Sequence, residues 1–222
     1  MFEDFRKFHR SRKPFEVSAL DSMASKYNWL NPYILEERQL NVTQLDIFSR
    51  LMMDRILFFG TEVNADTANI AVSQLLYLDN LEPGKDILMY INSPGGEVYS
   101  GYSILDTMDF IESPVGTTCT GMAASMGAVL LLCGEKGKRS ALKHSRVMIH
   151  QPLGGCSGQA SDIEIEAREI LKLRKELNEM IADKTGQSLE VINKDTDRDH
   201  WLTAEEAKAY GIIDEVITKT SK

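Results

Sequence analysis

The 222-residue sequence has little cysteine, no long apolar run and no excess of positive charge. Its three cysteines, Cys119, Cys133 and Cys156, form no CxxC pair, which argues against a disulfide framework and a cysteine-ligated metal. We interpret each one as a small buried hydrophobe in a reducing compartment. No stretch reaches about 18 consecutive apolar residues, so no membrane span is predicted. The net charge of −8 disfavours a nucleic-acid partner.

The composition, with 43% hydrophobic and 26% charged residues, is typical of a soluble globular protein and allows a packed enzyme. The first fourteen residues are basic and lack the apolar segment of a secretory signal, while Glu3 and Asp4 argue against a mitochondrial transit peptide. We therefore expect a leader or propeptide at 1–31, one folded domain at 32–217 and a tail at 218–222, in a cytoplasmic protein.

Apolar runs and helical periodicities alternate along the chain, which predicts an α/β fold of stacked right-handed βαβ units. The run Asp86–Ile91 is nearly continuous and predicts a strand buried on both faces. The other predicted strands are Ile56–Phe59, Val115–Cys119, Arg146–Ile149 and Ile212–Ile217. The predicted helices are Gln44–Ile56, Asn64–Asp79, Ser100–Ile111, one from near Ser125, Leu189–Lys194 and Ala204–Tyr210.

A long charged helix is predicted from Ser161 to about Lys184, opened by the capping box Ser161-Asp-Ile-Glu164. Its apolar residues recur with a heptad-like spacing, which fits either a partner interface or the inner side of a solvated helix.

Ser125 stands out among the serines because small residues surround it, with Ala123, Ala124 and Gly127 leaving room for a substrate backbone. The same small residues would also allow a helix to pack tightly on a sheet. Ala123 occupies the first glycine position of GxSxG, so the nucleophile elbow of an α/β-hydrolase is disfavoured.

A serine nucleophile requires a base, usually a histidine held by a carboxylate. His150 is the best candidate because it directly follows the apolar strand SRVMI, whereas the other three histidines lie in polar segments. The alternative is a structural histidine at a strand end. Spacing does not select the acid, since Asp195, Asp197 and Asp199 share one short segment.

The turn INSPGG follows a buried strand, and its two glycines permit the positive φ that an oxyanion cradle requires. An ordinary tight turn has the same composition. Neither GxGxxG nor GxxxxGK[ST] occurs there, so no nucleotide site is predicted.

Three segments in this order, INSPGGEVYSG, GMAASMGA and SRVMIHQPLGG, closely resemble the peptidase subunits of the Clp protease family, ClpP. The likeness continues through DIEIEAREILK, TGQSLEVINKDTDRD and AKAYGIIDEV, and covers the chain from about Pro32 to Ile217. It implies an α/β fold of the ClpP/crotonase type, in which stacked ββα (βαβ) units carry a protruding strand-helix handle.

The resemblance implies a serine endopeptidase that hydrolyses unfolded proteins to short peptides. The family motifs GxAASMG, MIHQP and DTxRD assign the nucleophile to Ser125, the general base to His150 and the acid to Asp199. The implied substrate contacts are the backbone N–H groups of an oxyanion hole at Gly96 and Met126, and the residues beside a bound peptide, Val98 and Leu153. No metal or cofactor is implied, because the partner hydrolyses the ATP.

Family members assemble as two stacked heptameric rings, a tetradecamer, and an AAA+ unfoldase of the ClpX, ClpA or ClpC type docks on the ring faces. The docking pocket is implied to include Leu51, Leu76, Tyr90 and Phe110. Contacts between rings are implied for Asp197 and Arg198. Near the axial pore the sequence departs from the family's Arg-Gly-Glu-Arg run and reads Leu40-Asn41-Val42-Thr43.

Two other functions share parts of this pattern. One is a catalytically silent scaffold subunit of the same assembly, which would have lost members of the triad. The other is a crotonase-like acyl-CoA enzyme, which builds an oxyanion hole without a Ser-His-Asp triad. The complete triad, and MIHQP in particular, favours the peptidase.

Overall fold

The central element of the protein is a parallel sheet, seen in a computed structural model that describes residues 33–38, 41–155 and 157–218. In this part of the chain the sheet has seven strands in the order β3-β4-β5-β6-β9, and β7 pairs with β5 and with β8. All pairs are parallel except β7 with β8. The strands are β3 (Ile56–Phe59), β4 (Ile87–Ser93), β5 (Val115–Ala124), β6 (Arg139–Leu142), β7 (Arg146–Ile149), β8 (His200–Thr203) and β9 (Glu215–Ile217). The α/β prediction is confirmed.

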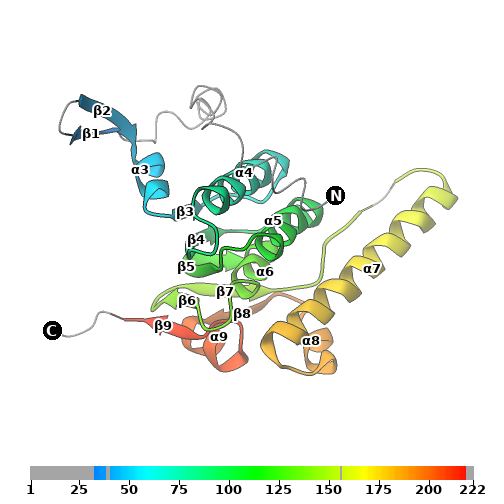
Figure 1. Ribbon diagram of the computed structural model, residues 1–222. Coiled ribbons are helices and arrows are strands. Elements are labelled where there is room, and N and C mark those ends of the chain that lie inside the picture. Colours follow the sequence, from blue (N-terminus) through cyan, green and yellow to red (C-terminus); the bar gives the residue numbers. More distant parts are fainter. Residues whose placement is uncertain (1–32, 39–40, 156, 219–222) are drawn as a thin grey trace.

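Helices connect these strands and cover the sheet. They are α3 (Ile47–Met53), α4 (Ala65–Leu81), α5 (Val98–Phe110), α6 (Met126–Leu132), α7 (Ala160–Thr185), α8 (Leu189–Asp195) and α9 (Ala204–Tyr210). In Figure 1, α4 and α5 lie side by side over β3, β4 and β5, and α7 projects away from the body of the molecule. This projecting helix corresponds to the expected handle.

The sequence of α4 shows why a helix forms there. The Asn64 side chain accepts a hydrogen bond from the Thr67 backbone, and the Thr67 hydroxyl accepts one from the Asn64 backbone, both at 3.0 Å. This reciprocal cap satisfies N–H groups that have no partner within the helix. The buried side chains then recur at three- and four-residue spacing, as Ala68, Ala71, Leu75 and Leu78. One face of α4 therefore belongs to the core.

The helix predicted for Gln44–Ile56 begins later than expected. Residues Asn41–Asp46 form β2, which pairs antiparallel with β1 (Tyr33–Arg38), and α3 starts at Ile47. The Asp46 side chain caps this helix by accepting from the Ser49 backbone at 3.0 Å. The helical spacing was therefore misleading for Leu45, which pairs with Ile34 of β1 instead of beginning the helix.

The prediction that β4 is buried on both faces is wrong. Ile87, Met89 and Ile91 are buried, but the alternate residues Leu88 and Tyr90 are only half-buried. The three buried side chains belong to the core. Leu88 and Tyr90 lie on the opposite face of the sheet, which the described part of this chain covers incompletely. That face is a candidate contact surface.

Helix α7 differs in two ways from its prediction. The helix begins at Ala160 with Gln159 as N-cap and no side-chain cap, so the predicted capping box at Ser161 does not form. The second half of α7 packs in the core through Leu173, Leu177 and Ile181, while its first half is exposed. The predicted leader at 1–31 and Leu40 lie outside the described residues.

Candidate active site

Ser125 lies at the junction between β5 and α6 in an unusual backbone conformation. Its φ is 53° and its ψ is −124°, a region that residues other than glycine rarely occupy. The Ser125 N–H donates to the Met148 carbonyl at 2.8 Å, which ties the junction to β7. Such local strain is held by surrounding structure and is common at functional sites.

His150 meets Ser125 because their strands are neighbours. Strands β5 and β7 run parallel with Ala124 opposite Met148, so the residues after both strands emerge at the same edge of the sheet. Nε2 of His150 lies 2.8 Å from Oγ of Ser125. The imidazole is mostly buried, with 13% of the side chain exposed.

Asp199 reaches the other side of the imidazole. It precedes β8, which pairs antiparallel with β7 so that His200 lies opposite Ile149. Oδ1 of Asp199 lies 2.9 Å from Nδ1 of His150. With Nδ1–H donated to the carboxylate, the lone pair of Nε2 faces the serine hydroxyl, which is the arrangement needed to remove its proton.

The two other aspartates of the segment point elsewhere. Oδ2 of Asp195 accepts a hydrogen bond from the Tyr210 hydroxyl at 2.9 Å. The carboxylate of Asp197 faces Gln151 at 3.4 Å and Arg174 at 3.8 Å. Of the three aspartates that the sequence left open, Asp199 is therefore the one in contact with His150. Arg198 is exposed.

The glycine turn packs directly against the serine. A Cβ added to Gly95 would lie 2.7 Å from Cβ of Ser125 and 2.9 Å from the nitrogen of Met126. Gly96 has a φ of 149° and pairs with Val63 in a short bridge. Within the described residues, the N–H groups of Gly96 and Met126 donate no hydrogen bond to the protein. Both are thus free to bind an oxygen atom next to Ser125.

The segment after His150 lies along α7. Leu153 is 85% exposed, and a Cβ on the neighbouring Gly154 would be 2.4 Å from the Ile170 side chain. Val98, the first residue of α5, is half-buried just beyond the glycine turn. Both residues therefore follow closely on parts of the chain that contact Ser125. Leu153 comes shortly after His150, and Val98 comes shortly after the glycine turn.

Of the predicted docking residues, Tyr90 lies on the incompletely covered face of β4, while Leu51, Leu76 and Phe110 belong to α3, α4 and α5. Leu51, Leu76 and Tyr90 are half-buried and Phe110 is 40% exposed. Sequence reasoning missed Phe48 and Phe58, which extend this group. Phe58 stacks on Tyr90 with centroids 5.2 Å apart and meets Phe48 edge-on at 6.0 Å. The signal for Phe58 was the apolar side chain on the outward-facing position of β3, between buried Leu57 and Phe59.

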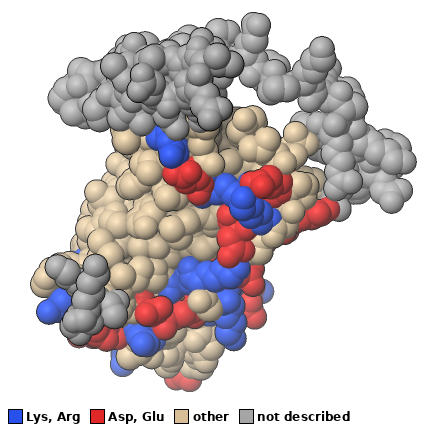
Figure 2. All heavy atoms as spheres, turned by 60° about the vertical axis from the view of Figure 1, so that its left-hand side comes forward, with Lys and Arg blue, Asp and Glu red and all other residues tan. Residues whose placement is uncertain are grey.

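One side of the molecule carries few charges. Figure 2 shows a broad uncharged area on the side that carries α3, β3 and β9, with Lys, Arg, Asp and Glu gathered beside it. Phe48 and Phe58 are about half exposed, at 46% and 47%. Large exposed aromatic side chains of this kind mark contact surfaces.

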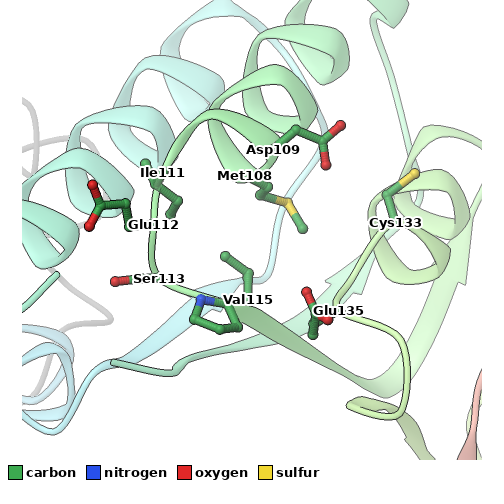
Figure 3. Close-up of a pocket in the computed structure, with 9 residues that line it drawn as sticks. Met108, Asp109, Ile111, Glu112, Ser113, Val115, Cys133 and Glu135 are labelled. Carbon is green, nitrogen blue, oxygen red and sulfur yellow. The ribbon is translucent and has the colours of Figure 1, made fainter. Parts of the chain in front are cut away.

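A separate pocket of about 190 Å³ lies where α5 ends and β5 begins (Figure 3). Its lining residues include Asp109, Glu112, Glu135 and Cys133. Burial raises the pKa of Cys133 to about 12, so this thiol is protonated at neutral pH and is no nucleophile. None of the three residues Ser125, His150 and Asp199 lines this pocket.

Two further findings concern metals and membranes. In the described residues, no group of three or more His, Cys, Asp and Glu side chains is arranged to hold a metal ion. Across the same ranges, no helix combines the length and apolar character needed to cross a bilayer.

Ser125, His150 and Asp199 form a hydrogen-bonded line at the edge of the sheet. This arrangement is typical of hydrolases with a Ser-His-Asp triad. Comparison with known proteins identifies the family. A sequence model described as Clp protease matches residues 38–220. Two proteins of Bacteroides fragilis are 63% and 67% identical, over 98% and 90% of this chain and 99% and 96% of their own lengths. A protein of Porphyromonas gingivalis is 56% identical over 99% of both chains. All three are named ATP-dependent Clp protease proteolytic subunit.

The chain belongs to the Clp protease family. This membership confirms the resemblance and the fold class inferred from the sequence. It also favours the protease over both alternatives, the acyl-CoA enzyme and the silent scaffold.

Proposed function

We propose that this chain is the proteolytic subunit of an ATP-dependent Clp protease and cuts peptide bonds as a serine endopeptidase. The observation that carries the proposal is the line of hydrogen bonds from Ser125 Oγ to His150 Nε2 and from His150 Nδ1 to Asp199. In this scheme Ser125 is the nucleophile, His150 the general base and Asp199 the residue that orients the imidazole.

The reaction is acyl transfer in two steps. In the first, Ser125 Oγ bonds to the peptide carbonyl carbon while its proton passes to His150 Nε2. His150 then protonates the leaving amine, and the C–N bond breaks. In the second step, His150 takes a proton from water, which attacks the ester and releases the carboxylic acid, and the proton returns to Ser125.

The negative charge that develops on the carbonyl oxygen is bound by the N–H groups of Gly96 and Met126. Support comes from their lack of protein partners and from the packing of the glycine turn on Ser125. Donors fixed in place before the reaction stabilise the transition state without reorganising. Val98 and Leu153 flank the extended backbone of an unfolded protein substrate.

The ATP-dependent step belongs to a separate chain in this proposal. The relatives' name includes ATP dependence, whereas the turn INSPGG lacks the glycine spacing of a phosphate-binding loop. An AAA+ unfoldase of the ClpX, ClpA or ClpC type would deliver unfolded substrate, docking on the aromatic surface formed by Phe48, Phe58 and Tyr90. This chain then needs no cofactor of its own.

The proposed assembly is two stacked heptameric rings in the cytoplasm. Its support is the projecting half of α7, where Ile163, Ile165 and Leu171 are 38%, 58% and 62% exposed. Apolar side chains on a projecting helix are stabilised by burial against another chain. Asp197 and Arg198, at the base of α7, are assigned to the contact between rings.

The test is hydrolysis of a short fluorogenic peptide by the assembled protein. Ser125→Ala is expected to lower kcat by about 10⁴-fold or more and to leave the gel-filtration mass unchanged. Ser73→Ala is the matched control, because this exposed hydroxyl on α4 donates, among the residues that the structure describes, to the Asn69 carbonyl of its own helix. Turnover by Ser125→Ala at the rate of the control would refute the proposal.

A further inference from the structure

Packing does little to hold the carboxylate of Asp199 in place. The side chain is 60% exposed, and within the described residues its hydrogen-bond partner is His150. An exposed side chain on a short connection takes its position from the backbone that carries it. The position of the Asp199 carboxylate therefore depends on how the backbone between α8 and β8 is held.

Two sets of hydrogen bonds fasten this backbone to the strand that carries His150. On one side His200 pairs with Ile149. On the other, the Gln151 N–H donates to the Thr196 carbonyl at 2.6 Å, and its side-chain amide donates to the Asp197 carbonyl at 2.9 Å. The residues just before and after His150 are thus bonded to residues on both sides of Asp199.

Thr196 is the buried end of this connection. It is the C-cap of α8 and is fully buried. Its hydroxyl has one proton, which is shared between two acceptors, the Ile192 carbonyl at 2.8 Å and Oδ1 of Asn178 at 3.2 Å. The backbone that leads to Asp199 is therefore in contact, at Thr196, with the Asn178 side chain of α7.

Asn178 is an unexpected residue at its position. It is 1% exposed and lies among the buried residues Leu173, Leu177 and Ile181 on the core face of α7. Burying an amide costs free energy unless it is hydrogen-bonded, and leucine would fill such a site without that cost. The amide is satisfied by Thr196 and by Asn193 Oδ1, which accepts from it at 2.7 Å. Both partners belong to the segment that leads to Asp199.

We infer that Asn178 and Thr196 are positioning residues that hold Asp199 against His150 and couple this geometry to the packing of α7. The inference rests on the proposed function, since it assigns work to the acid of the triad. The hydrogen bond between Asn178 and Thr196 fixes the end of α8, and Gln151 transmits that position to the strand carrying His150. A shift of about 1 Å in a catalytic group is enough to lower turnover strongly.

The first test compares two substitutions at one buried site. Thr196→Val removes the hydroxyl and keeps the shape, while Thr196→Ser keeps the hydroxyl. We expect Thr196→Val to lower kcat for a short peptide about 10-fold, with KM within about 2-fold, as the loss of one hydrogen bond predicts. Thr196→Ser should restore most of kcat. Equal kcat in the two variants would overturn the inference.

The second test separates positioning from general stability. Asn178→Leu is made in the wild type and in Asp199→Ala, and kcat is measured at raised enzyme concentration, with thermal midpoint and gel-filtration mass. We expect about a 10-fold loss in the wild type and less than about 2-fold in Asp199→Ala, because a residue that acts through Asp199 has nothing left to position. An equal loss in both backgrounds would contradict the inference. If Asn178→Leu does not assemble, the comparison of kcat between Thr196→Val and Thr196→Ser tests the inference by itself.

The same experiment distinguishes failure of the inference from failure of the proposed function. If Asp199→Ala alone leaves kcat unchanged, the acid of the proposed triad is wrong. If Asp199→Ala lowers kcat but Thr196→Val and Asn178→Leu do not, the triad stands and the positioning role is refuted.

Discussion

Nε2 of His150 lies 2.8 Å from Oγ of Ser125, although 25 residues separate them in the chain. The contact depends on the register of two parallel strands, since Ala124 pairs opposite Met148 and β5 and β7 end just before Ser125 and His150. A sheet sets such distances more accurately than a pair of loops does, because its backbone hydrogen bonds resist sliding. The geometry is thus built into the core before substrate binds.

Gly95 tests how closely the glycine turn must approach Ser125. We expect Gly95→Ala to lower peptidase activity about 100-fold and to reduce the thermal midpoint, because its φ is 91° and the new Cβ would lie 2.6 Å from the Ala124 carbonyl oxygen. Gly60→Ala is the control, since a Cβ there meets no atom within 4 Å. Activity of Gly95→Ala equal to that control would show that the close approach is dispensable.

Asp214 and Arg139 form an ion pair whose loss should destabilise the fold. The Arg139 side chain is 5% exposed, and its guanidinium donates two hydrogen bonds to the Asp214 carboxylate, at 2.6 and 3.0 Å. Asp214→Asn leaves the guanidinium buried without its counterion, so we expect a loss of about 3 kcal/mol in the free energy of unfolding by urea at pH 7. Asp86→Asn removes the exposed partner of Lys138 and should cost about 1 kcal/mol or less. Equal losses would contradict this account.

The same pair predicts a pH dependence. Hydrogen bonds from Arg139 hold the pKa of Asp214 below its ordinary value of 3.8. Because the folded pKa is the lower one, the stabilisation is complete above 3.8 and is lost as pH falls through the folded pKa. The difference in unfolding free energy between wild type and Asp214→Asn should therefore shrink on acidification, measured at fixed protein concentration. A difference that grows on acidification would refute the assignment.

The thiols of Cys119, which is buried, and Cys133, which is half-buried, should be unreactive. Burial raises the pKa of Cys119 to about 11 and that of Cys133 to about 12, so almost no thiolate exists at pH 8. We expect iodoacetamide at pH 8 to leave both residues unmodified in the folded protein, as measured by mass spectrometry of peptides, and to label both after denaturation. Rapid labelling of either thiol in the folded protein would contradict the raised pKa values.

Phe58 tests the proposed docking surface. Phe58→Ala removes the ring that contacts both Tyr90 and Phe48. We expect ATP-dependent degradation with a Clp ATPase to fall at least about 10-fold, as for a central aromatic residue of an interface, and to fall more than short-peptide hydrolysis does. Leu189→Ala, which shortens an exposed side chain on α8, is the control. Equal effects on the two activities would argue for a structural role.

Part of the site could be predicted from the residues themselves. Ser125 stood out by its small neighbours and His150 by following a buried strand, although each kept a structural alternative. Their meeting at one edge of the sheet depends on β5 reaching Ala124, beyond the predicted strand end at Cys119. Asp199 could not be selected this way, and it was assigned by resemblance to a family. Its contact depends on the pairing of Ile149 with His200, and on where α8 ends, neither of which leaves a local signal.

The errors in the predicted fold also arise from contacts between residues that are distant in the sequence. The spacing in Gln44–Ile56 suits a helix, but its first residues pair with Tyr33–Arg38 and become a strand. Strand β6 (Arg139–Leu142) was missed because its four residues include arginine and serine, which are buried through hydrogen bonds rather than by apolar character. Helix α9 was predicted with its observed bounds, since Thr203 and Glu206 form a local capping box.

The most direct test of the central claim is the mass of the protein after reaction with a fluorophosphonate. A serine activated by His150 should form one covalent adduct per chain, on the peptide that contains Ser125, and the adduct should be absent from Ser125→Ala and from His150→Ala. Absence of an adduct in the assembled wild-type protein, or an adduct on another serine, would contradict the account.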